Sequence, residues 1–174
     1  MNEILKKLPV AIKMLILDVD GVLTNGNIML LPTGEEVKVF NTQDGHGIKM
    51  LQEAGIDVAI ITGRDSPACA FRAKQLKIKY YFAGIADKLE AFRQLLQQSN
   101  LSAGQCAYMG DDLPDLPVLK QVGLSIAPSN AHKKVLEAVD YVTQRTGGDA
   151  AVREVCDGLL KAYHGDIFDK AYMA

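Results

Sequence analysis

The sequence predicts a doubly wound, Rossmann-like α/β domain, in which helices cover both faces of a mostly parallel sheet and a β-hairpin projects from it. Short apolar runs without polar alternation are typical of strands that are buried on both faces. These runs alternate along the chain with longer segments of helical periodicity. The 174 residues are 48% hydrophobic and 23% charged and contain no evident linker, so we expect residues 1–174 to form one domain.

Six apolar runs are expected to form the strands. They are Met14–Leu17, Val58–Ile61, Tyr80–Phe82, Ala107–Met109, Leu124–Ile126 and Tyr141–Val142. The segment before the first run is apolar, but Lys13 interrupts it and no small-residue cleavage site follows. We interpret it as a lead-in to the first strand and not as a signal peptide. No apolar stretch approaches the length of a membrane span.

Six segments have apolar residues at helical spacing. They are Asp44–Ala54, Ser66–Lys77, Asp87–Gln98, Pro114–Gln121, Ala131–Ala138 and Ala150–Tyr163. Gly55 is expected to cap the end of the first helix. Ser66 and Pro67 are expected to be the N-cap and first residue of the second. A lone Asp in the position of Asp87 is more often a helix N-cap than a site residue.

A hairpin is expected at about residues 27–40, where two extended stretches flank Pro32-Thr33-Gly34. It follows the first strand directly and is expected to project over the sheet edge. Its apolar side chains suggest either an interface with another subunit or packing against the chain's own core. The tail at about 164–174 is expected to be loosely ordered and to help to cover the site.

Charge and cysteine content exclude several classes of function. The net charge of −2 provides no basic field for nucleic acid. The three cysteines, Cys69, Cys106 and Cys156, form no CxxC pair, which argues against a disulfide framework or a zinc site. Such cysteine usage is typical of a reducing cytoplasm. The expected partner is therefore a small molecule, with no nucleic acid and no membrane.

Polar residues cluster where the predicted strands end, at the edge where open α/β sheets bind ligands. These residues are Asp18, Asp20, Thr62, Arg64, Lys88, Asp111, Asp112 and Asp115. Asp18, Asp20 and Asp111 would repel one another unless a cation lay between them. Oxygen donors without His or Cys favour Mg²⁺. Thr62 and Lys88 are suitable donors to a phosphate group.

These segments resemble, in chain order, the four motifs of the haloacid dehalogenase-like phosphatases: DVDGVLT at 18–24, Thr62, Lys88, and GDDLPD at 110–115. The resemblance implies that Asp18 is the nucleophile and forms an aspartyl-phosphate, with Asp20 as general acid and base. It implies Mg²⁺ ligation by Asp18, Asp111 and the backbone carbonyl of Asp20. Thr62 and Lys88 would stabilise the transferring phosphoryl group. Asp112 and Asp115 would orient metal-bound waters or Lys88.

The intervals between these motifs are too short for a cap domain, so the chain resembles the capless members. Among them, 34–41, 44–47, 60–64 and 147–156 resemble the 3-deoxy-D-manno-octulosonate 8-phosphate (KDO 8-phosphate) phosphatases of lipopolysaccharide biosynthesis. The resemblance implies a cytoplasmic homotetramer, with the hairpin between subunits and a neighbouring chain over each site. The implied substrate-binding residues are Asn41, Thr42, Gln43, Asp44, Gly45, Arg64, Arg72 and Lys88.

Three alternatives stay open. Phosphatases of nonulosonate 9-phosphates look similar but often carry Glu after Thr-Gly, so Arg64 favours the octulosonate, whose carboxylate suits a guanidinium. His46 and Lys49 stand where Tyr and Arg are common in the family, which affects fine specificity. A receiver-like signalling module would lack Asp20 and the GDDLPD segment. An inactive regulatory module would be expected to have lost catalytic positions, and every one is present.

Overall fold

A computed structural model describes Met1 and residues 10–165 of the chain. Its centre is a six-stranded sheet with the order β5-β4-β1-β6-β7-β8 and parallel pairing throughout. The strands are β1 (Met14–Leu17), β4 (Asp57–Ile61), β5 (Tyr80–Phe82), β6 (Cys106–Met109), β7 (Leu124–Ala127) and β8 (Tyr141–Val142). All six predicted strands are present. The central strands β1 and β6 are fully buried, as their uninterrupted apolar sequences require.

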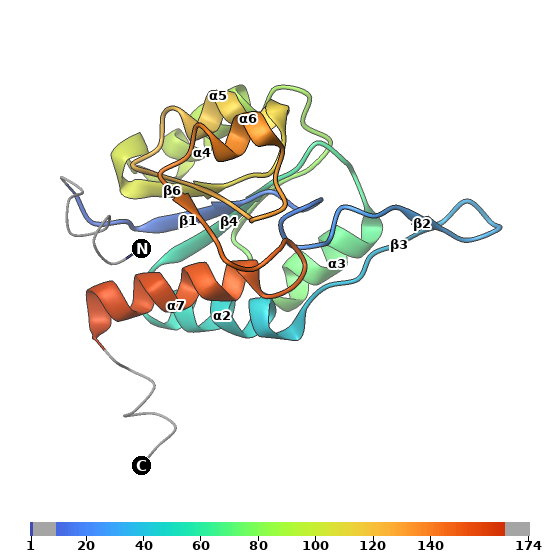
Figure 1. Ribbon diagram of the computed structural model, residues 1–174, viewed down its shortest axis with the longest axis horizontal. Helices are drawn as coiled ribbons and strands as arrows, with labels where there is room; N and C mark the ends of the chain where they lie inside the picture. The colour runs from blue at the N-terminus through green and yellow to red at the C-terminus, as the bar shows by residue number, and fades with distance from the viewer. Residues whose placement is uncertain (2–9, 166–174) are drawn as a thin grey trace, which may run out of the picture.

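Helices cover both faces of the sheet, which confirms the doubly wound fold (Figure 1). One face is covered by α2 (Thr42–Glu53), α3 (Pro67–Gln75) and α7 (Ala151–His164), and the other by α4 (Lys88–Ser99), α5 (Leu116–Leu119) and α6 (Lys133–Leu136). Two short 3₁₀ helices, Ala103–Gln105 and Leu113–Asp115, precede and follow β6. Each face has its own apolar core, with Ile48 and Leu159 on one side and Phe92 and Leu95 on the other.

The predicted cap positions agree with the structure, although the side chain of Ser66, the N-cap of α3, makes no capping hydrogen bond. Asp87 caps α4 by accepting hydrogen bonds from the amides of Leu89 and Glu90, at 2.9 and 3.1 Å. Pro67 opens α3, and Gly55 follows α2 with a φ of +81°. Helix α2 begins two residues before the predicted Asp44, because the side chain of Asn41 caps it.

Two predicted helices are much shorter than expected. The segment Pro114–Gln121 is a 3₁₀ turn followed by the four residues of α5. The segment Ala131–Ala138 is helical only over α6, because the chain must then turn into β8. That turn is fixed by Asp140, whose carboxylate accepts hydrogen bonds from both the amide and the hydroxyl of Ser125.

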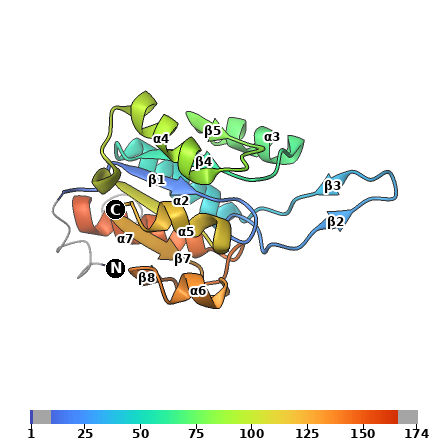
Figure 2. The ribbon, with the colours of Figure 1, turned by 90° about the horizontal axis from the view of Figure 1, so that it is seen from above.

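The predicted hairpin is present and projects from the body of the protein (Figures 1 and 2). Its paired part is only β2 (Met29–Leu30) and β3 (Glu36–Val37), shorter than the predicted extended stretches. Pairing stops after Val37 because the following residues contact the body: Lys38 reaches Asp20, and the Phe40 ring lies under the guanidinium of Arg72.

Among the described residues, no helix has the length and apolarity needed to span a bilayer. Residues 2–9, within the predicted lead-in, and residues 166–174, most of the predicted tail, lie outside the described part of the chain.

Candidate active site

A cavity of about 460 Å³ opens at the carboxyl ends of β1, β4 and β6. It is lined by Asp18, Asp20, Gly26, Thr62, Gly63, Arg64, Ile85, Ala86, Lys88, Asp111, Asp112, Pro114 and Asp115. All eight polar residues that the sequence placed at this edge are therefore together. The edge collects them because parallel strands end side by side there.

The loop after β1 presents Asp18 and Asp20 to the cavity. Its closing residue is Thr24, whose hydroxyl accepts hydrogen bonds from the amides of Gly21 and Gly26 at 3.4 and 3.3 Å. The same hydroxyl donates to the carbonyl of Val19, also at 3.4 Å. Gly21 has a φ of +87°, and a Cβ atom there would overlap the Asp111 carboxylate. The threonine and glycine of the motif thus shape the loop that carries the two carboxylates.

Lys88 joins the two acidic segments of the cavity. Its ammonium group lies 3.0 Å from Asp18 Oδ1 and 2.7 Å from Asp115 Oδ1, and its side chain is buried. Burial alone would lower the pKa of Lys88, but the two carboxylates outweigh that effect and raise it. Lys88 is therefore held in its charged form beside Asp18.

Asp115 is the fixed support of Lys88. Its Oδ1 also accepts a hydrogen bond of 2.6 Å from the hydroxyl of Tyr108, and its Oδ2 accepts from the amides of Asp111 and Asp112 at 3.1 and 3.2 Å. Sequence reasoning did not include Tyr108. The available signal was a tyrosine in a fully buried strand, because a buried hydroxyl requires a partner.

Carboxylate oxygens of Asp18, Asp111 and Asp115 lie within 4.8 Å of one another. Burial, with the neighbouring carboxylates, raises the pKa of Asp18 to about 6 and of Asp111 to about 7. The hydrogen bonds above occupy both oxygens of Asp115, whereas Lys88 contacts only Oδ1 of Asp18. Asp18 and Asp111 are therefore the carboxylates better placed to bind a cation. An all-oxygen donor set with excess negative charge fits Mg²⁺.

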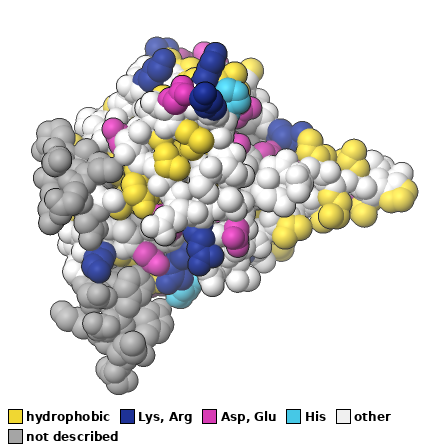
Figure 3. Space-filling view, in the orientation of Figure 1, with side chains coloured by type: hydrophobic (Ala, Val, Ile, Leu, Met, Phe, Trp, Pro, Cys, Tyr) yellow, Lys and Arg dark blue, Asp and Glu magenta, His cyan; other side chains and the backbone are white. Residues whose placement is uncertain are grey.

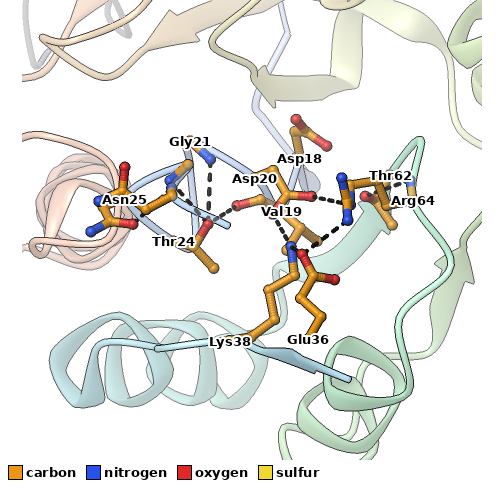
Figure 4. A network of polar contacts seen from close by, with 12 residues as sticks. Asp18, Val19, Asp20, Gly21, Thr24, Asn25, Glu36, Lys38, Thr62 and Arg64 are labelled. Atoms are coloured by element: carbon orange, nitrogen blue, oxygen red, sulfur yellow. Dashed lines mark hydrogen bonds and ion pairs between the residues drawn. The ribbon is translucent and has the colours of Figure 1, made fainter. Parts of the chain in front are cut away.

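The base of the hairpin forms a second charged cluster at the cavity (Figure 4). The ammonium group of Lys38 contacts Asp20 Oδ1 and lies 3.1 Å from Glu36 Oε1. The same Glu36 oxygen lies 3.0 Å from Arg64 Nη2, and Arg64 Nε is 3.9 Å from Asp20 Oδ2. Sequence reasoning did not assign Lys38 or Glu36 to the site. Their spacing of two residues on an extended segment was the signal, because it places both side chains on one face.

The remaining predicted residues occupy different surroundings. Thr62, at the end of β4, is buried at the cavity, and Asp112 caps the turn after β6 by accepting from the amide of Leu113 at 2.8 Å. None of the residues 41–45 lines the cavity, and neither does Arg72. Within one chain, Asp44 instead accepts a hydrogen bond of 2.8 Å from the amide of Arg153 in α7.

The site combines two carboxylates that lie two residues apart, Asp18 and Asp20, with Thr62, Lys88 and a second acidic segment. These groups meet at one edge of a doubly wound sheet. This arrangement defines the site of a haloacid dehalogenase-like hydrolase. A family model of that description matches residues 82–155.

The chain is 49% identical to 3-deoxy-D-manno-octulosonate 8-phosphate phosphatase KdsC of Yersinia pestis. The alignment extends over 151 residues and covers 87% of this chain and 81% of that protein. A structure of the phosphatase from Moraxella catarrhalis, in complex with magnesium, phosphate and KDO, is 42% identical with a TM-score of 0.93 and covers 99% of each chain. A cobalt-bound phosphatase from Haemophilus influenzae is 44% identical with a TM-score of 0.87, covering 91% of this chain and 93% of that one. The chain belongs to the 3-deoxy-D-manno-octulosonate 8-phosphate phosphatase family.

Proposed function

We propose that this chain is a Mg²⁺-dependent phosphomonoesterase that hydrolyses 3-deoxy-D-manno-octulosonate 8-phosphate to KDO and phosphate. The observation that carries the proposal is the buried Asp18 carboxylate at the cavity, 3.0 Å from the ammonium group of Lys88 and two residues from Asp20. The arrangement provides a nucleophile, an adjacent proton donor and a fixed positive charge around one position.

In the first step, an Asp18 oxygen attacks phosphorus while the bond between phosphorus and the sugar oxygen breaks. Protonated Asp20 gives its proton to that oxygen, so the sugar leaves as an alcohol and Asp18 carries the phosphoryl group. In the second step, Asp20 takes a proton from water as the water attacks the aspartyl-phosphate. This restores the Asp18 carboxylate, returns the proton to Asp20 and yields inorganic phosphate.

Other residues stabilise the charge that moves in these steps. Lys88 and the Thr62 hydroxyl lie at the cavity, where they can donate to the phosphoryl oxygens. Asp18, Asp111 and the backbone carbonyl of Asp20 would hold Mg²⁺, which supplies positive charge to the phosphoryl group. Asp115 holds the ammonium group of Lys88 in place through a hydrogen bond and is not itself proposed to contact the phosphoryl group.

The proposed substrate is a sugar acid, and Arg64 is the residue suited to its carboxylate. Its half-exposed guanidinium lines the cavity, where it contacts Glu36. A guanidinium that already pairs with a carboxylate has the geometry to exchange it for another. The relatives named for this substrate support the octulosonate over a nonulosonate 9-phosphate.

We also propose a homotetramer in the cytoplasm. The hairpin side chains Ile28, Met29, Leu30, Leu31 and Val39 are exposed, and they form a row of hydrophobic surface along the projection (Figure 3). A hairpin that reaches a neighbouring subunit would bury this row. Residues 41–45 and Arg72 would then contribute to substrate binding from the subunit interface. The buried free thiols suit a reducing compartment.

The test is phosphate release from KDO 8-phosphate with Mg²⁺, beside a nonulosonate 9-phosphate and neutral sugar phosphates. We expect the octulosonate to have the highest kcat/KM, EDTA to abolish turnover, and Asp18→Asn to lower kcat by at least about 10⁴-fold. Preference for the nonulosonate would reassign the substrate but keep the chemistry. Full activity in Asp18→Asn would overturn the proposed mechanism.

A further inference from the structure

Lys38 lies on the hairpin return segment and enters the active site from there (Figure 4). Its side chain is only 1% exposed, although the surrounding hairpin is largely exposed. Its ammonium group contacts two carboxylates, Asp20 and Glu36. A lysine in an exposed hairpin ordinarily extends into solvent, so burial of this one between two acids is a specific arrangement.

The contact with Asp20 distinguishes the two oxygens of that carboxylate. Lys38 engages Oδ1, whereas Oδ2 faces Arg64 at the longer distance of 3.9 Å. An ammonium group has only donors, so it fixes the oxygen that it contacts as an acceptor. The proton that Asp20 transfers must therefore be carried by Oδ2. This orients the carboxylate and fixes the oxygen from which the proton leaves.

Glu36 allows a cation to be placed so close to a proton donor. It shares the ammonium group of Lys38, which offsets part of the positive charge that Asp20 would otherwise face. The same Glu36 oxygen holds Arg64 at 3.0 Å. The hairpin thus supplies a neutral pair, Lys38 with Glu36, that contacts the catalytic carboxylate through one hydrogen bond.

We propose that Lys38, supported by Glu36, is a positioning residue that aims Asp20 at the leaving-group oxygen of the substrate. The inference builds on the proposed function, since it concerns the proton donor of that reaction. Lys38 acts through Asp20, whereas Lys88 acts on the phosphoryl group directly. The hairpin consequently contributes to the chemistry as well as to any assembly.

The test compares two esters that differ in their need for a proton donor. A sugar alkoxide leaves only when protonated, whereas p-nitrophenolate leaves as an anion. The value of kcat/KM reports phosphoryl transfer to Asp18 and excludes the later hydrolysis step. In Lys38→Met, we expect kcat/KM to fall by about 100-fold for KDO 8-phosphate and by less than about threefold for p-nitrophenyl phosphate, both at saturating Mg²⁺.

The ratio of the two values is measured on one preparation, so any unfolded fraction cancels. Lys38→Gln serves as a second neutral variant if Lys38→Met fails to fold. Lys120→Met, an exposed lysine after α5, is the matched control and should leave the ratio unchanged. Equal losses for both esters, or no loss in either, would overturn the positioning role. A wild-type protein inactive on both esters would overturn the proposed function itself, and the two failures are therefore distinguishable.

Discussion

Gly147 packs directly against Gly21 in the loop that carries Asp18 and Asp20. A Cβ atom at position 147 would lie 2.5 Å from the carbonyl carbon of Gly21, closer than packed atoms allow. The next residue, Gly148, donates a hydrogen bond of 3.0 Å to the carbonyl of Val22. The segment before α7 therefore packs against the loop that carries Asp18 and Asp20 and supports it. Only a residue without a side chain fits at position 147.

Gly147→Ala should displace that loop. We expect a loss of about 1–3 kcal/mol in the free energy of unfolding, because the overlap is with backbone atoms that cannot move aside cheaply. Turnover should fall more than stability alone explains, since Asp18 and Asp20 move with the loop. Chemical denaturation and steady-state kinetics measure the two effects. Gly104→Ala is the matched control, because among the described residues its Cβ would meet only Val10 Cγ2, at 3.5 Å.

The support of Lys88 can be tested at Asp115. Asp115→Ala removes the acceptor for Lys88, Tyr108 and two amides, and leaves a buried ammonium group with one partner fewer. Breaking a buried pair in this way is expected to cost about 3–5 kcal/mol of stability. Tyr108→Phe removes one hydrogen bond from the same carboxylate and should cost about 1 kcal/mol. Similar unfolding free energies for the two variants would contradict the central place given to Asp115.

Metal binding should depend on pH. The pKa of Asp18 is raised to about 6 and that of Asp111 to about 7, mainly by burial and by the neighbouring carboxylates. Raised carboxylate pKa values mean that the metal-free protein holds extra protons and loses stability as pH rises from about 4 to about 7. Mg²⁺ must displace those protons, so its affinity should strengthen over the upper part of this range.

Thermal melting with and without Mg²⁺ at pH 5.5, 6.5 and 7.5 measures this effect. We expect the Mg²⁺-induced rise in Tm to grow with pH, and calorimetry in buffers of different ionisation enthalpy to detect proton release. Asp111→Asn should lose most of the Mg²⁺-induced rise. A rise of the same size at all three pH values would contradict the assignment of these carboxylates as ligands.

Asp44 offers a second pH-dependent group, away from the cavity. It is buried in α2, one of its oxygens accepts from the amide of Arg153, and the other oxygen has no hydrogen-bond partner among the described residues. Burial raises its pKa to about 6 against the weaker lowering effect of the α7 amides. Ionisation of Asp44 therefore destabilises the fold, and the free energy of unfolding falls as pH rises from about 4 to about 6.

Asp44→Asn should flatten this part of the stability profile and be at least as stable as wild type above pH 6. Asn keeps an oxygen that accepts from the amide of Arg153, in the first turn of α7. Asp44→Ala removes this acceptor and should lower the free energy of unfolding by about 1 kcal/mol. Urea denaturation across the pH range measures both variants. An increase in KM for Asp44→Asn would support the role in substrate binding that the family resemblance implies.

The sequence predicted the sheet well because each strand is a buried apolar run whose pattern is local. Strands β4, β6 and β7 each differ from their predictions by one residue, which is Asp57, Cys106 and Ala127 respectively. Helices α5 and α6 were too long in prediction because the chain turns toward the next strand soon after each of them. For α6 that turn is fixed by Asp140, just before β8, which accepts a hydrogen bond from the amide of Ser125 in β7.

The convergence of the motif residues on one cavity was predictable because the ends of parallel strands meet at one sheet edge. Contacts between distant segments were not. Lys38 meets Asp20 only after the hairpin has folded back, and Asp44 meets an amide 109 residues away. The close approach of Gly147 to Gly21 was not predictable either, because it joins two loops that lie far apart in the sequence.

The apolar hairpin should determine the oligomeric state. Leu30 is 62% exposed in β2, so a charge there would not disturb the core of its own chain. Leu30→Lys should therefore leave the Tm of the isolated subunit nearly unchanged but split the proposed tetramer, because burying an unpaired ammonium group in an interface is costly. Light scattering coupled to size exclusion measures the mass. Val142→Lys, on the exposed side of β8, is the control that should retain the assembly.

Activity then separates the two contributions of the hairpin. If a neighbouring subunit covers each site, the Leu30→Lys monomer should show a raised KM for KDO 8-phosphate while it still turns over p-nitrophenyl phosphate, since Asp18, Asp20 and Lys38 all belong to one chain. A monomeric wild-type protein would contradict the proposed assembly. A tetramer that persists in Leu30→Lys would instead place the interface on another surface, and the exposed hairpin would then need a different partner.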